Sequence, residues 1–335
     1  MIKSDIIIIG AGPCGLFSVF EAGLLKMRCH LIDSLPQPGG QCSEIYPKKP
    51  IYDIPGFPEI LAGDLIKNLM KQIAPFNPGF TLGERVEIIK KQSDDSFFVV
   101  TNRGTEHSCR VIVIAAGLGC FEPRKPMVEN LSFFEDKGVD YIIKDPFKFK
   151  GKKVVVSGGG DSALDWAIYL ADGIASQVTL VHRRDSFRGH VESVEKIHKM
   201  SNSGKINLIT NAEVQALKGA DKLTSLTIKA EKNNFSIETD YWVPLFGLTP
   251  KLGPIANWGL NLNKNAIEVN TYDYSTNIEG IYAIGDINTY PGKLKLILSG
   301  FHESALMCQS AFKYIFPNGK KSFKYTTVLG GIEGF

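Results

Sequence analysis

Two parts of the chain repeat one pattern of apolar and polar positions: a short apolar run, a glycine cluster, and a segment with apolar residues at helical spacing. The first pairs DIIIIG at residues 5–10 with PCGLFSVFEAGLL at 13–25, and the second pairs KVVVSG at 153–158 with SALDWAIYLADGI at 162–174. A continuous apolar run that ends in glycine is typical of a parallel strand buried on both faces. The sequence therefore predicts two strand–turn–helix units.

The first glycine cluster has the spacing of a dinucleotide-binding turn, G-x-G-x-x-G. In such a turn Gly10 permits the tight bend, Gly12 lets the backbone approach a pyrophosphate, and Gly15 lets the next helix pack closely on the sheet. The segment RCHLIDS at 28–34 predicts a second strand, and Asp33 at its end follows Gly15 by 18 residues, where a carboxylate can bind ribose hydroxyls. The predicted site comprises Gly10, Gly12, Cys14, Gly15 and Asp33. A purely structural glycine turn is the alternative.

The second glycine cluster leads to a different charge. The segment QVTLV at 177–181 predicts the next strand, and arginines follow it where the first site has Asp33. Guanidinium groups pair with a 2′-phosphate that a carboxylate would repel, so this site is predicted to bind NADP(H) rather than NAD(H). A solvated basic loop is the alternative. The predicted residues are Gly158, Gly160, Ser162, Ala163, His182, Arg183, Arg184 and Arg188.

Two further strands and a long helix indicate that the first site binds a flavin. The segments CRVIVIAAGLG at 109–119 and NIEGIYAIGDI at 277–287 both predict strands, and the second ends in Gly285-Asp286. The Asp286 carboxylate could bond the hydroxyls of FAD. The apolar helix predicted at 294–316 could direct its N-terminal dipole at the flavin N1 and C2 carbonyl. An ordinary strand-end turn is the alternative for Gly285-Asp286.

These elements predict an α/β fold with two dinucleotide-binding, Rossmann-like domains. We expect a discontinuous FAD domain, residues 1–117 and 248–335, with an NADP domain, residues 118–247, inserted into it; the crossing segments are rich in Gly and Pro. Within the insert, residues 224–247 predict a β-hairpin that turns at Asn233-Asn234, with its second strand leading back to the FAD domain.

Composition and charge narrow the function classes. With 44% hydrophobic and 22% charged residues and a net charge of +3, the chain is an ordinary globular protein without the basic surface of a nucleic-acid-binding protein. No apolar stretch is long enough to span a membrane, and the histidines and cysteines lack metal-ligand spacing. The cysteines form no C-x-x-C pair, and with no export signal we expect reduced thiols in the cytoplasm; they are Cys14, Cys29, Cys42, Cys109, Cys120 and Cys308.

The order of these motifs resembles the thioredoxin reductase superfamily, and more closely the thioredoxin reductase-like, or type 2, ferredoxin NADP reductases of bacteria. The resemblance covers essentially the whole chain. HRRDSFR and the Gly-Asp segment are common to the superfamily, whereas IYPKKPIYDIPGFP and a tail beyond the last long helix favour the type 2 enzymes.

The resemblance implies a set of flavin contacts. Asp33 would hold the adenosine ribose, Val86 would contact adenine, and Asp286 would bind the ribityl chain. Gln41 and Tyr46 would line the flavin, with the Tyr46 ring against it, and Phe121 would lie near the flavin at the crossing segment. From the tail, Thr327 would reach the edge of the isoalloxazine, and Tyr325 would cover the opposite face in its own subunit or in the other subunit of a homodimer. Tyr46 and Tyr325 are thus the predicted catalytic residues, acting by stacking.

The absence of a dithiol indicates how electrons leave. In reductases of the glutathione reductase kind, a cysteine after Gly-Gly is followed five residues later by a second, but here Pro47 stands five residues after Cys42. Thioredoxin reductases carry C-x-x-C just before the second glycine strand, and residues 136–156 contain no cysteine. The predicted activity is therefore transfer between NADPH and a ferredoxin or flavodoxin through FAD, with a hydride entering and single electrons leaving.

Three rival functions remain open. Cys42 alone could serve an NADPH-dependent disulfide or peroxide reductase as a sulfenic acid. A flavin monooxygenase is disfavoured because its glycine-histidine motif is not found between the domains, and a nucleotide sensor would bind both cofactors without efficient turnover. Lysines at 48 and 49 and between 144 and 153 could attract an acidic ferredoxin, or could simply keep the protein soluble.

Overall fold

The apolar run near the N-terminus forms the central strand of a five-stranded parallel sheet. The computed structural model describes residues 1–230 and 233–320, with the side chains of 120–122 and 248–250 outside that description. The sheet has the order β22-β10-β2-β3-β6, and every neighbouring pair is parallel. Its strands are β2 (Ile6–Ile9), β3 (Cys29–Asp33), β6 (Gly79–Leu82), β10 (Val111–Ile114) and β22 (Ile281–Ala283).

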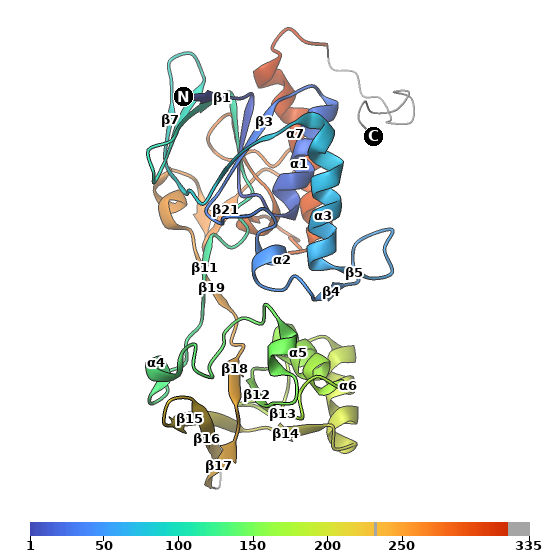
Figure 1. The fold of residues 1–335 in the computed structure, drawn as a ribbon. Coiled ribbons are helices and arrows are strands. Elements are labelled where there is room, and N and C mark those ends of the chain that lie inside the picture. Colours follow the sequence, from blue (N-terminus) through green and yellow to red (C-terminus); the bar gives the residue numbers. More distant parts are fainter. Residues whose placement is uncertain (231–232, 321–335) are drawn as a thin grey trace. The chain divides into compact units, whose positions relative to one another are not determined.

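Both faces of this sheet are covered, which explains why its strands are continuously apolar. Ile6 and Ile8 belong to the core cluster on the helical side, whereas Ile7 and Ile9 belong to the cluster on the other side. The first face is covered by three helices, α1 (Pro13–Leu24), α3 (Ala62–Ile73) and α7 (Ile297–Ile315) (Figure 1). The second face carries a sheet of order β1-β9-β8-β7, made of β1 (Ile2–Lys3), β7 (Val86–Lys91), β8 (Phe97–Thr101) and β9 (Glu106–Cys109).

The second apolar run forms a separate parallel sheet of order β14-β13-β12-β18. Its strands are β12 (Lys153–Ser157), β13 (Gln177–Val181), β14 (Ile206–Ile209) and β18 (Tyr241–Pro244). The helices α5 (Asp161–Ala171) and α6 (Val191–Asn202) pack with Val154 and Val156. Val155 and the fully buried Trp242 pack instead with a three-stranded antiparallel sheet. The alternation of Val154, Val155 and Val156 between two cores repeats the arrangement of the first sheet.

The three-stranded sheet corrects one expectation about the hairpin. Its strands are β15 (Ala212–Gly219), β16 (Leu223–Ala230) and β17 (Asn234–Glu238). Asn234 lies within β17 and pairs with Lys229, so the prediction that it forms part of the turn is wrong. The hairpin's second strand also ends at Glu238, and a separate strand, β18, continues the chain beside β12.

The chain divides into two compact units, Met1–Cys120 with Pro250–Phe335, and Phe121–Thr249. The linking strands β11 (Cys120–Pro123) and β19 (Leu248–Lys251) pair with each other. The remaining short elements are α2 (Gln41–Glu44), β4 (Pro50–Ile51), β5 (Ile60–Leu61), η1 (Ala74–Phe76), α4 (Leu131–Phe134), η2 (Pro146–Phe149), η3 (Gly253–Asn257), β20 (Leu262–Asn263), β21 (Ala266–Glu268), η4 (Gly285–Ile287) and β23 (Asn288–Thr289).

Candidate functional site

The first glycine turn connects β2 to α1 at the carboxyl edge of the five-stranded sheet. Gly10 has φ of +108°, and a Cβ atom there would lie 2.4 Å from the carbonyl oxygen of Ala115. A Cβ atom at Gly15 would lie 2.1 Å from the carbonyl oxygen of Gly10, so the helix can approach only without a side chain. A Cβ atom at Gly12 would meet no atom within 4 Å. The backbone at Gly12 therefore faces open space at the start of the helix.

Asp33 closes this turn from the end of β3. Its carboxylate accepts hydrogen bonds from the backbone N–H of Ala11 at 2.7 Å and from that of Leu35 at 2.9 Å. Only 9% of Asp33 is exposed. Burial raises the pKa of this carboxyl, and the two backbone donors partly offset that effect. Asp33 thus holds the turn and places a carboxylate beside it.

Asp286 lies at the same edge of the sheet, in the short helix η4 that follows β22. Burial raises the pKa of its carboxyl, and the nearby ammonium groups of Lys295 and Lys293 partly counter the shift. Within the described residues, the carboxylate receives no hydrogen bond. A half-buried carboxylate without a donor suits hydroxyl groups of a ligand.

A buried ion pair that sequence reasoning missed lies immediately behind Asp286. Glu303 of α7 is fully buried and is paired with Lys293, whose side chain is only 5% exposed. The Glu303 carboxylate also accepts hydrogen bonds from Gly285 N–H at 2.6 Å, Asn288 Nδ2 at 2.9 Å and the Tyr290 hydroxyl at 2.9 Å. The signal in the sequence was helical spacing, because Glu303 shares the buried face of α7 with residues 300, 304, 307, 308 and 311.

The short helix α2 carries the predicted flavin-lining residues Gln41 and Tyr46 at its start and just beyond its end. Gln41 lies beside the backbone after β10, where a Cβ atom at Gly117 would be 3.6 Å from Gln41 Nε2. The Tyr46 hydroxyl and the Cys42 thiol share a hydrogen bond. Tyr46 is half-buried and packs against the helical-side core.

The two thiols near this site are protonated at neutral pH. Cys42 is 2% exposed, and burial raises its pKa to about 11 against a smaller lowering by Tyr46. Burial, with Asp286 and Glu303 as smaller contributors, raises the pKa of Cys14 to about 12. Cys14 Sγ lies at the contact between α1 and α7, where a Cβ atom at Gly300 would be 2.2 Å from it. These two and three other cysteines are free thiols: Cys14, Cys29, Cys42, Cys109 and Cys308.

The other predicted flavin contacts have varied positions. Val86 begins β7 and is 2% exposed, with its side chain in the core cluster between the two sheets. Tyr325 and Thr327 lie outside the described residues, as does the side chain of Phe121. The structure therefore gathers Gly10, Gly12, Gly15, Asp33 and Asp286 along one edge of the sheet, with Cys14 beside Gly285, and it gives Val86 a core position.

The second glycine turn joins β12 to α5 in the same manner. A Cβ atom at Gly158 would lie 2.6 Å from Leu245 O, whereas one at Gly160 would meet nothing within 4 Å. Ser162 is exposed in the first turn of α5, and Ala163 is fully buried. Neither α1 nor α5 has a hydrogen bond from its N-cap side chain, because the N-cap residues are Gly12 and Gly160. Backbone N–H groups at such helix starts can bind phosphate.

His182 supports the second turn from beneath. Its side chain is 7% exposed, and a Cβ atom at Gly159 would lie 2.1 Å from His182 Cε1. The His182 ring stacks on Phe187 at 5.0 Å, and Nε2 lies 3.1 Å from Ser186 O. Burial lowers the pKa of His182, and the three nearby arginines add to that effect. The imidazole therefore packs inside the turn.

The three arginines follow His182 on the exposed side. Arg183, Arg184 and Arg188 are all exposed, and the backbone N–H of Arg188 donates to Gly159 O at 2.7 Å. In the same way, His190 N–H donates to Asp161 Oδ1 at 2.7 Å. The arginine segment is thus bonded to the glycine turn, and within the described part of the chain its three exposed guanidinium groups have no side-chain partner.

The donor sets fit two different dinucleotides. The first edge offers an open glycine, uncapped helix N–H groups and two carboxylates, which suit a pyrophosphate and hydroxyl-rich sugars. The second offers an open glycine, uncapped N–H groups and guanidinium groups, which suit a 2′-phosphate. The orphaned Oδ1 of the fully buried Asn288 adds an acceptor without a donor among the described residues.

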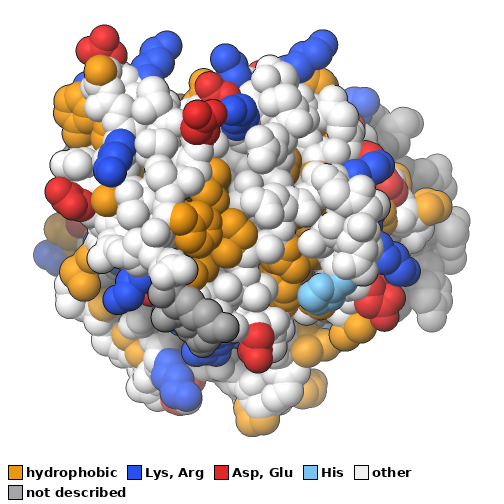
Figure 2. Space-filling view, turned by 90° about the horizontal axis from the view of Figure 1, so that it is seen from below, with side chains coloured by type: hydrophobic (Ala, Val, Ile, Leu, Met, Phe, Trp, Pro, Cys, Tyr) orange, Lys and Arg blue, Asp and Glu red, His pale blue; other side chains and the backbone are white. Residues whose placement is uncertain are grey.

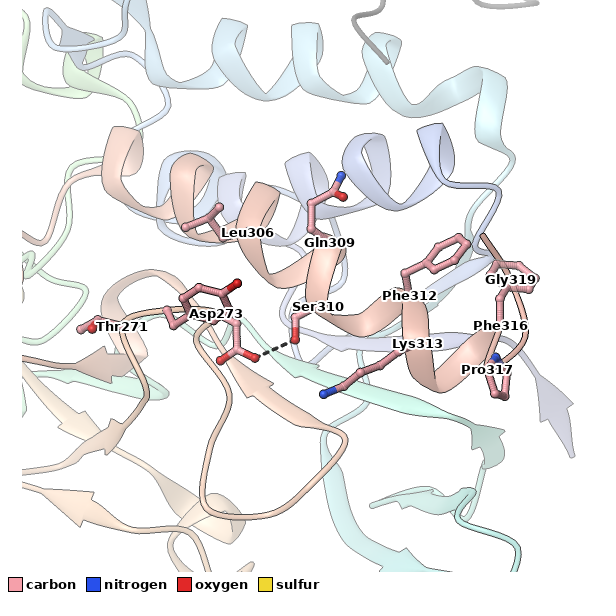
Figure 3. A pocket seen from close by; sticks show the side chains of 11 residues that line it. Thr271, Asp273, Leu306, Gln309, Ser310, Phe312, Lys313, Phe316, Pro317 and Gly319 are labelled. Atoms are coloured by element: carbon pink, nitrogen blue, oxygen red, sulfur yellow. Dashed lines mark hydrogen bonds between the residues drawn. The ribbon is translucent and has the colours of Figure 1, made fainter. Parts of the chain in front are cut away.

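A groove elsewhere in the first unit is separate from these residues. It has a volume of about 640 Å³ and lies between the loop at 271–273 and the second half of α7 (Figure 3). Asp273 accepts a hydrogen bond from Ser310 at 2.6 Å in this groove. Across the described part of the chain, no helix is long and apolar enough to cross a membrane, and no group of three or more His, Cys, Asp or Glu side chains could hold a metal ion.

A family model described as pyridine nucleotide-disulphide oxidoreductase matches residues 4–304, and the chain belongs to that family. Its sequence is similar to two proteins named ferredoxin–NADP reductase. The first, ferredoxin–NADP reductase 1 of Christiangramia forsetii, is 66% identical over 100% of this chain and 96% of that protein. The second, from Nitrobacter winogradskyi, is 51% identical over 99% of this chain and 97% of that protein. The resemblance predicted from the motifs is confirmed.

Solved structures support the predicted fold class. The thioredoxin reductase of Lactococcus lactis matches with a TM-score of 0.80 at 26% identity, covering 94% of this chain and 100% of that chain. The thioredoxin reductase of T. acidophilum matches with a TM-score of 0.80 at 25% identity, covering 93% and 99%. The prediction of a thioredoxin reductase-like α/β fold with Rossmann-type sheets is confirmed.

Proposed function

We propose that this protein transfers electrons between NADPH and a ferredoxin through bound FAD, without a redox disulfide. One observation carries the proposal. The chain has two glycine turns of similar geometry, and the strand beside each turn ends in residues of opposite charge. Asp33 follows the first, and Arg183 and Arg184 follow the second. The relatives named ferredoxin–NADP reductase, at 51 to 66% identity over nearly the whole chain, supply the activity.

The first unit would hold FAD. Gly12 and the N-terminal N–H groups of α1 would receive the pyrophosphate, and Asp33 the adenosine ribose. The donorless carboxylate of Asp286 would accept hydroxyls of the ribityl chain. When bound, FAD accepts electrons in pairs and releases them singly. Gln41 at the start of α2 and Tyr46 just beyond its end would position the ring and exclude water, together with Phe121, Tyr325 and Thr327.

The second unit would hold NADP(H). Gly160 and the start of α5 would receive the pyrophosphate, and Arg183, Arg184 and Arg188 the 2′-phosphate. Buried His182 would support the loop that carries these arginines. Val86 and Ala163, both in core positions, would shape the two nucleotide pockets through packing.

The rival function that used Cys42 as a peroxide- or disulfide-reducing thiol is not favoured. A thiol that is 2% exposed with a pKa of about 11 is both inaccessible and protonated at neutral pH. The thiolate is the reactive form of cysteine, so the environment of Cys42 opposes that chemistry. Cys42 instead donates or accepts one hydrogen bond with Tyr46 and packs in the core.

The partner is proposed to be an acidic ferredoxin or flavodoxin, and the protein a cytoplasmic homodimer. Lys48 and Lys49 lie beyond α2, close in sequence to Tyr46. In the second unit, Lys148 pairs with Asp140 at 2.7 Å and Lys153 with Glu238 at 2.7 Å. On the face in Figure 2, both charge signs surround exposed apolar side chains and no single positive surface forms.

The experiment that tests this function begins with the purified protein. Its released cofactor should be FAD, and anaerobic NADPH should bleach the flavin absorbance far faster than NADH at equal concentration. Addition of oxidised ferredoxin should then restore the absorbance in one-electron steps. A protein that binds FAD and NADPH but does not pass electrons to ferredoxin or flavodoxin would be a nucleotide sensor.

A further inference from the structure

Glu303 of the buried pair Lys293–Glu303 contacts Gly285, the residue immediately before the proposed flavin ligand Asp286. Glu303 accepts a hydrogen bond from the backbone N–H of Gly285 at 2.6 Å, so its carboxylate holds the residue immediately before Asp286. Through Asn288, Tyr290 and Lys293 the same carboxylate is bonded to three further points of the segment that joins β22 to α7. A single side chain thus fixes the whole connection to the helix.

Burial of this ion pair costs free energy, because both charged groups are removed from water. The hydrogen bonds of the pair alone do not explain why it is kept in this place. Two opposite charges removed from water stabilise a fold no better than well-packed apolar residues do, whereas removal of one partner leaves the other charge uncompensated. Nearby positions show that the core here is apolar, since Ile284 and Ile287 flank the turn and are almost fully buried. A charged pair in such a place therefore suggests a role in electrostatics as well as in shape.

The charges of the pair reach the residues around the proposed cofactor. Lys293 lowers, and Glu303 raises, the pKa of both Asp286 and Cys14. The pair is therefore electrostatically coupled to groups that belong to two different parts of the site, the turn after β22 and the start of α1. Any change in its net charge would be felt by a cofactor bound between them.

We propose that Lys293 and Glu303 are positioning residues that hold the Gly285-Asp286 turn and set the reduction potential of the bound flavin through their balanced charge. This inference rests on the proposed function, because it requires that Asp286 contacts FAD. Loss of Glu303 leaves a net positive charge that stabilises the reduced, electron-rich flavin. Loss of Lys293 leaves a net negative charge that destabilises it.

The test compares Glu303→Gln with Lys293→Met in the FAD-loaded protein. Midpoint potentials are measured by absorbance during equilibration with redox dyes, a readout that needs neither NADPH nor ferredoxin. At a fixed potential, the ratio of reduced to oxidised flavin should rise about tenfold in Glu303→Gln and fall about tenfold in Lys293→Met. Shifts in the same direction, or none, would overturn the proposal, because a merely structural role has no sign.

The matched controls lie near the C-terminal end of α7: Lys313 is in its last turn, and Glu279, which precedes β22, contacts Tyr314 there. Glu279→Gln and Lys313→Met make the same charge changes near Tyr314, where Glu279 is exposed and bonded to the Tyr314 hydroxyl at 3.2 Å. Tyr314 follows Glu303 by 11 residues, about 16 Å along the helix. The two control variants should keep the wild-type potential, and an equal shift in them would refute a local effect of the pair.

Two further results keep the outcome decisive. If Glu303→Gln does not fold, Lys293→Met against Lys293→Arg decides the matter, because Arg retains the positive charge and should restore the wild-type potential. If the variants show the predicted shifts in potential but the wild-type protein fails to reduce ferredoxin, the proposed function is overturned and this inference stands. Normal ferredoxin reduction with unshifted variants would do the reverse.

Discussion

The backbone N–H of Arg188 donates a hydrogen bond to the carbonyl oxygen of Gly159 at 2.7 Å. This bond joins the arginine segment to the second glycine turn, so the groups that we propose bind a pyrophosphate and a 2′-phosphate are held next to each other. The His182 ring beneath Gly159 strengthens the same junction, since it fills the space that a side chain at Gly159 would need. The local fold thereby holds together the groups that we propose bind NADPH.

Replacement of Arg183 and Arg184 by Ala should weaken the binding of NADPH more than the binding of NADH. Each charge-assisted hydrogen bond to the 2′-phosphate contributes about 1.5–3 kcal/mol, so KM for NADPH should rise roughly tenfold to a hundredfold per arginine. NADH lacks that phosphate, and its KM should change little. Lys205→Ala, which removes an exposed positive charge elsewhere in the same unit, should change neither. Equal effects on the two nucleotides would refute the assignment of these arginines.

Gly12→Ala and Gly15→Ala should separate cofactor binding from folding. A methyl group at Gly12 meets no protein atom within 4 Å, so the apoprotein should keep its stability within about 1 kcal/mol while FAD retention falls. A methyl group at Gly15 would lie 2.1 Å from Gly10 O, so that variant should lose about 1–3 kcal/mol of unfolding free energy. Thermal denaturation of apoprotein and FAD titration measure the two effects. A Gly12→Ala protein that binds FAD normally would show that the pyrophosphate lies elsewhere.

The buried histidines His30 and His107 predict a loss of stability in acid. Their rings lie 4.8 Å apart, and burial lowers the pKa of His30 to about 4 and also lowers that of His107. Because the folded protein binds these protons less readily than the unfolded chain, stability is full above pH 6.5. It falls as the pH drops from about 6.5 toward 4, by roughly 3 kcal/mol for His30.

Urea denaturation at pH 8 and pH 5 tests this effect. His107→Leu should be less sensitive to acid than the wild type, because it removes one of the two buried rings whose pKa is lowered. Leu can replace this ring because neither ring nitrogen of His107 has a hydrogen-bond partner within the described residues. His302→Gln changes an exposed histidine in the same unit and should keep the wild-type dependence. An unchanged pH dependence in His107→Leu would assign the acid sensitivity to other groups.

Hydrogen peroxide should not engage Cys42. A protonated thiol that is 2% exposed should survive peroxide treatment, and NADPH consumption should not depend on peroxide beyond the slow oxidation of the flavin itself. Thiol titration before and after treatment gives the measurement. Loss of one thiol with matching NADPH consumption would restore the peroxide reductase hypothesis.

The parallel strands and the glycine turns at their carboxyl ends were the most predictable part of the molecule. Ile6 to Ile9 alternate between two cores, and this double burial produces the continuous apolar run that the sequence displays. Glycine is required at positions 10 and 15 because of steric contacts within the turn itself, so the glycine pattern could be recognised without knowledge of the fold. Asp33 follows from strand length alone, because it ends the neighbouring parallel strand.

The remainder depended on contacts between distant parts of the chain. Glu303 receives its donors from residues 10 to 18 positions earlier, so its burial could not be inferred from charge, although the helical spacing of its neighbours placed it on the buried face. His182 was grouped with the arginines by sequence proximity, but its ring packs beneath Gly159. Asn234 was wrongly predicted to lie in the turn because its pairing with Lys229, not the Asn-Asn dipeptide, sets the register.

In the proposed reaction, electrons pass from the flavin to a one-electron carrier with no thiol in the path. The most direct test mixes the NADPH-reduced Cys42→Ser protein with oxidised ferredoxin under anaerobic conditions and follows both absorbances by stopped flow. We expect flavin reduction and ferredoxin reduction at rates within about twofold of the wild type, because the buried thiol takes no part. A variant whose flavin is still reduced by NADPH but which no longer reduces ferredoxin would contradict the account.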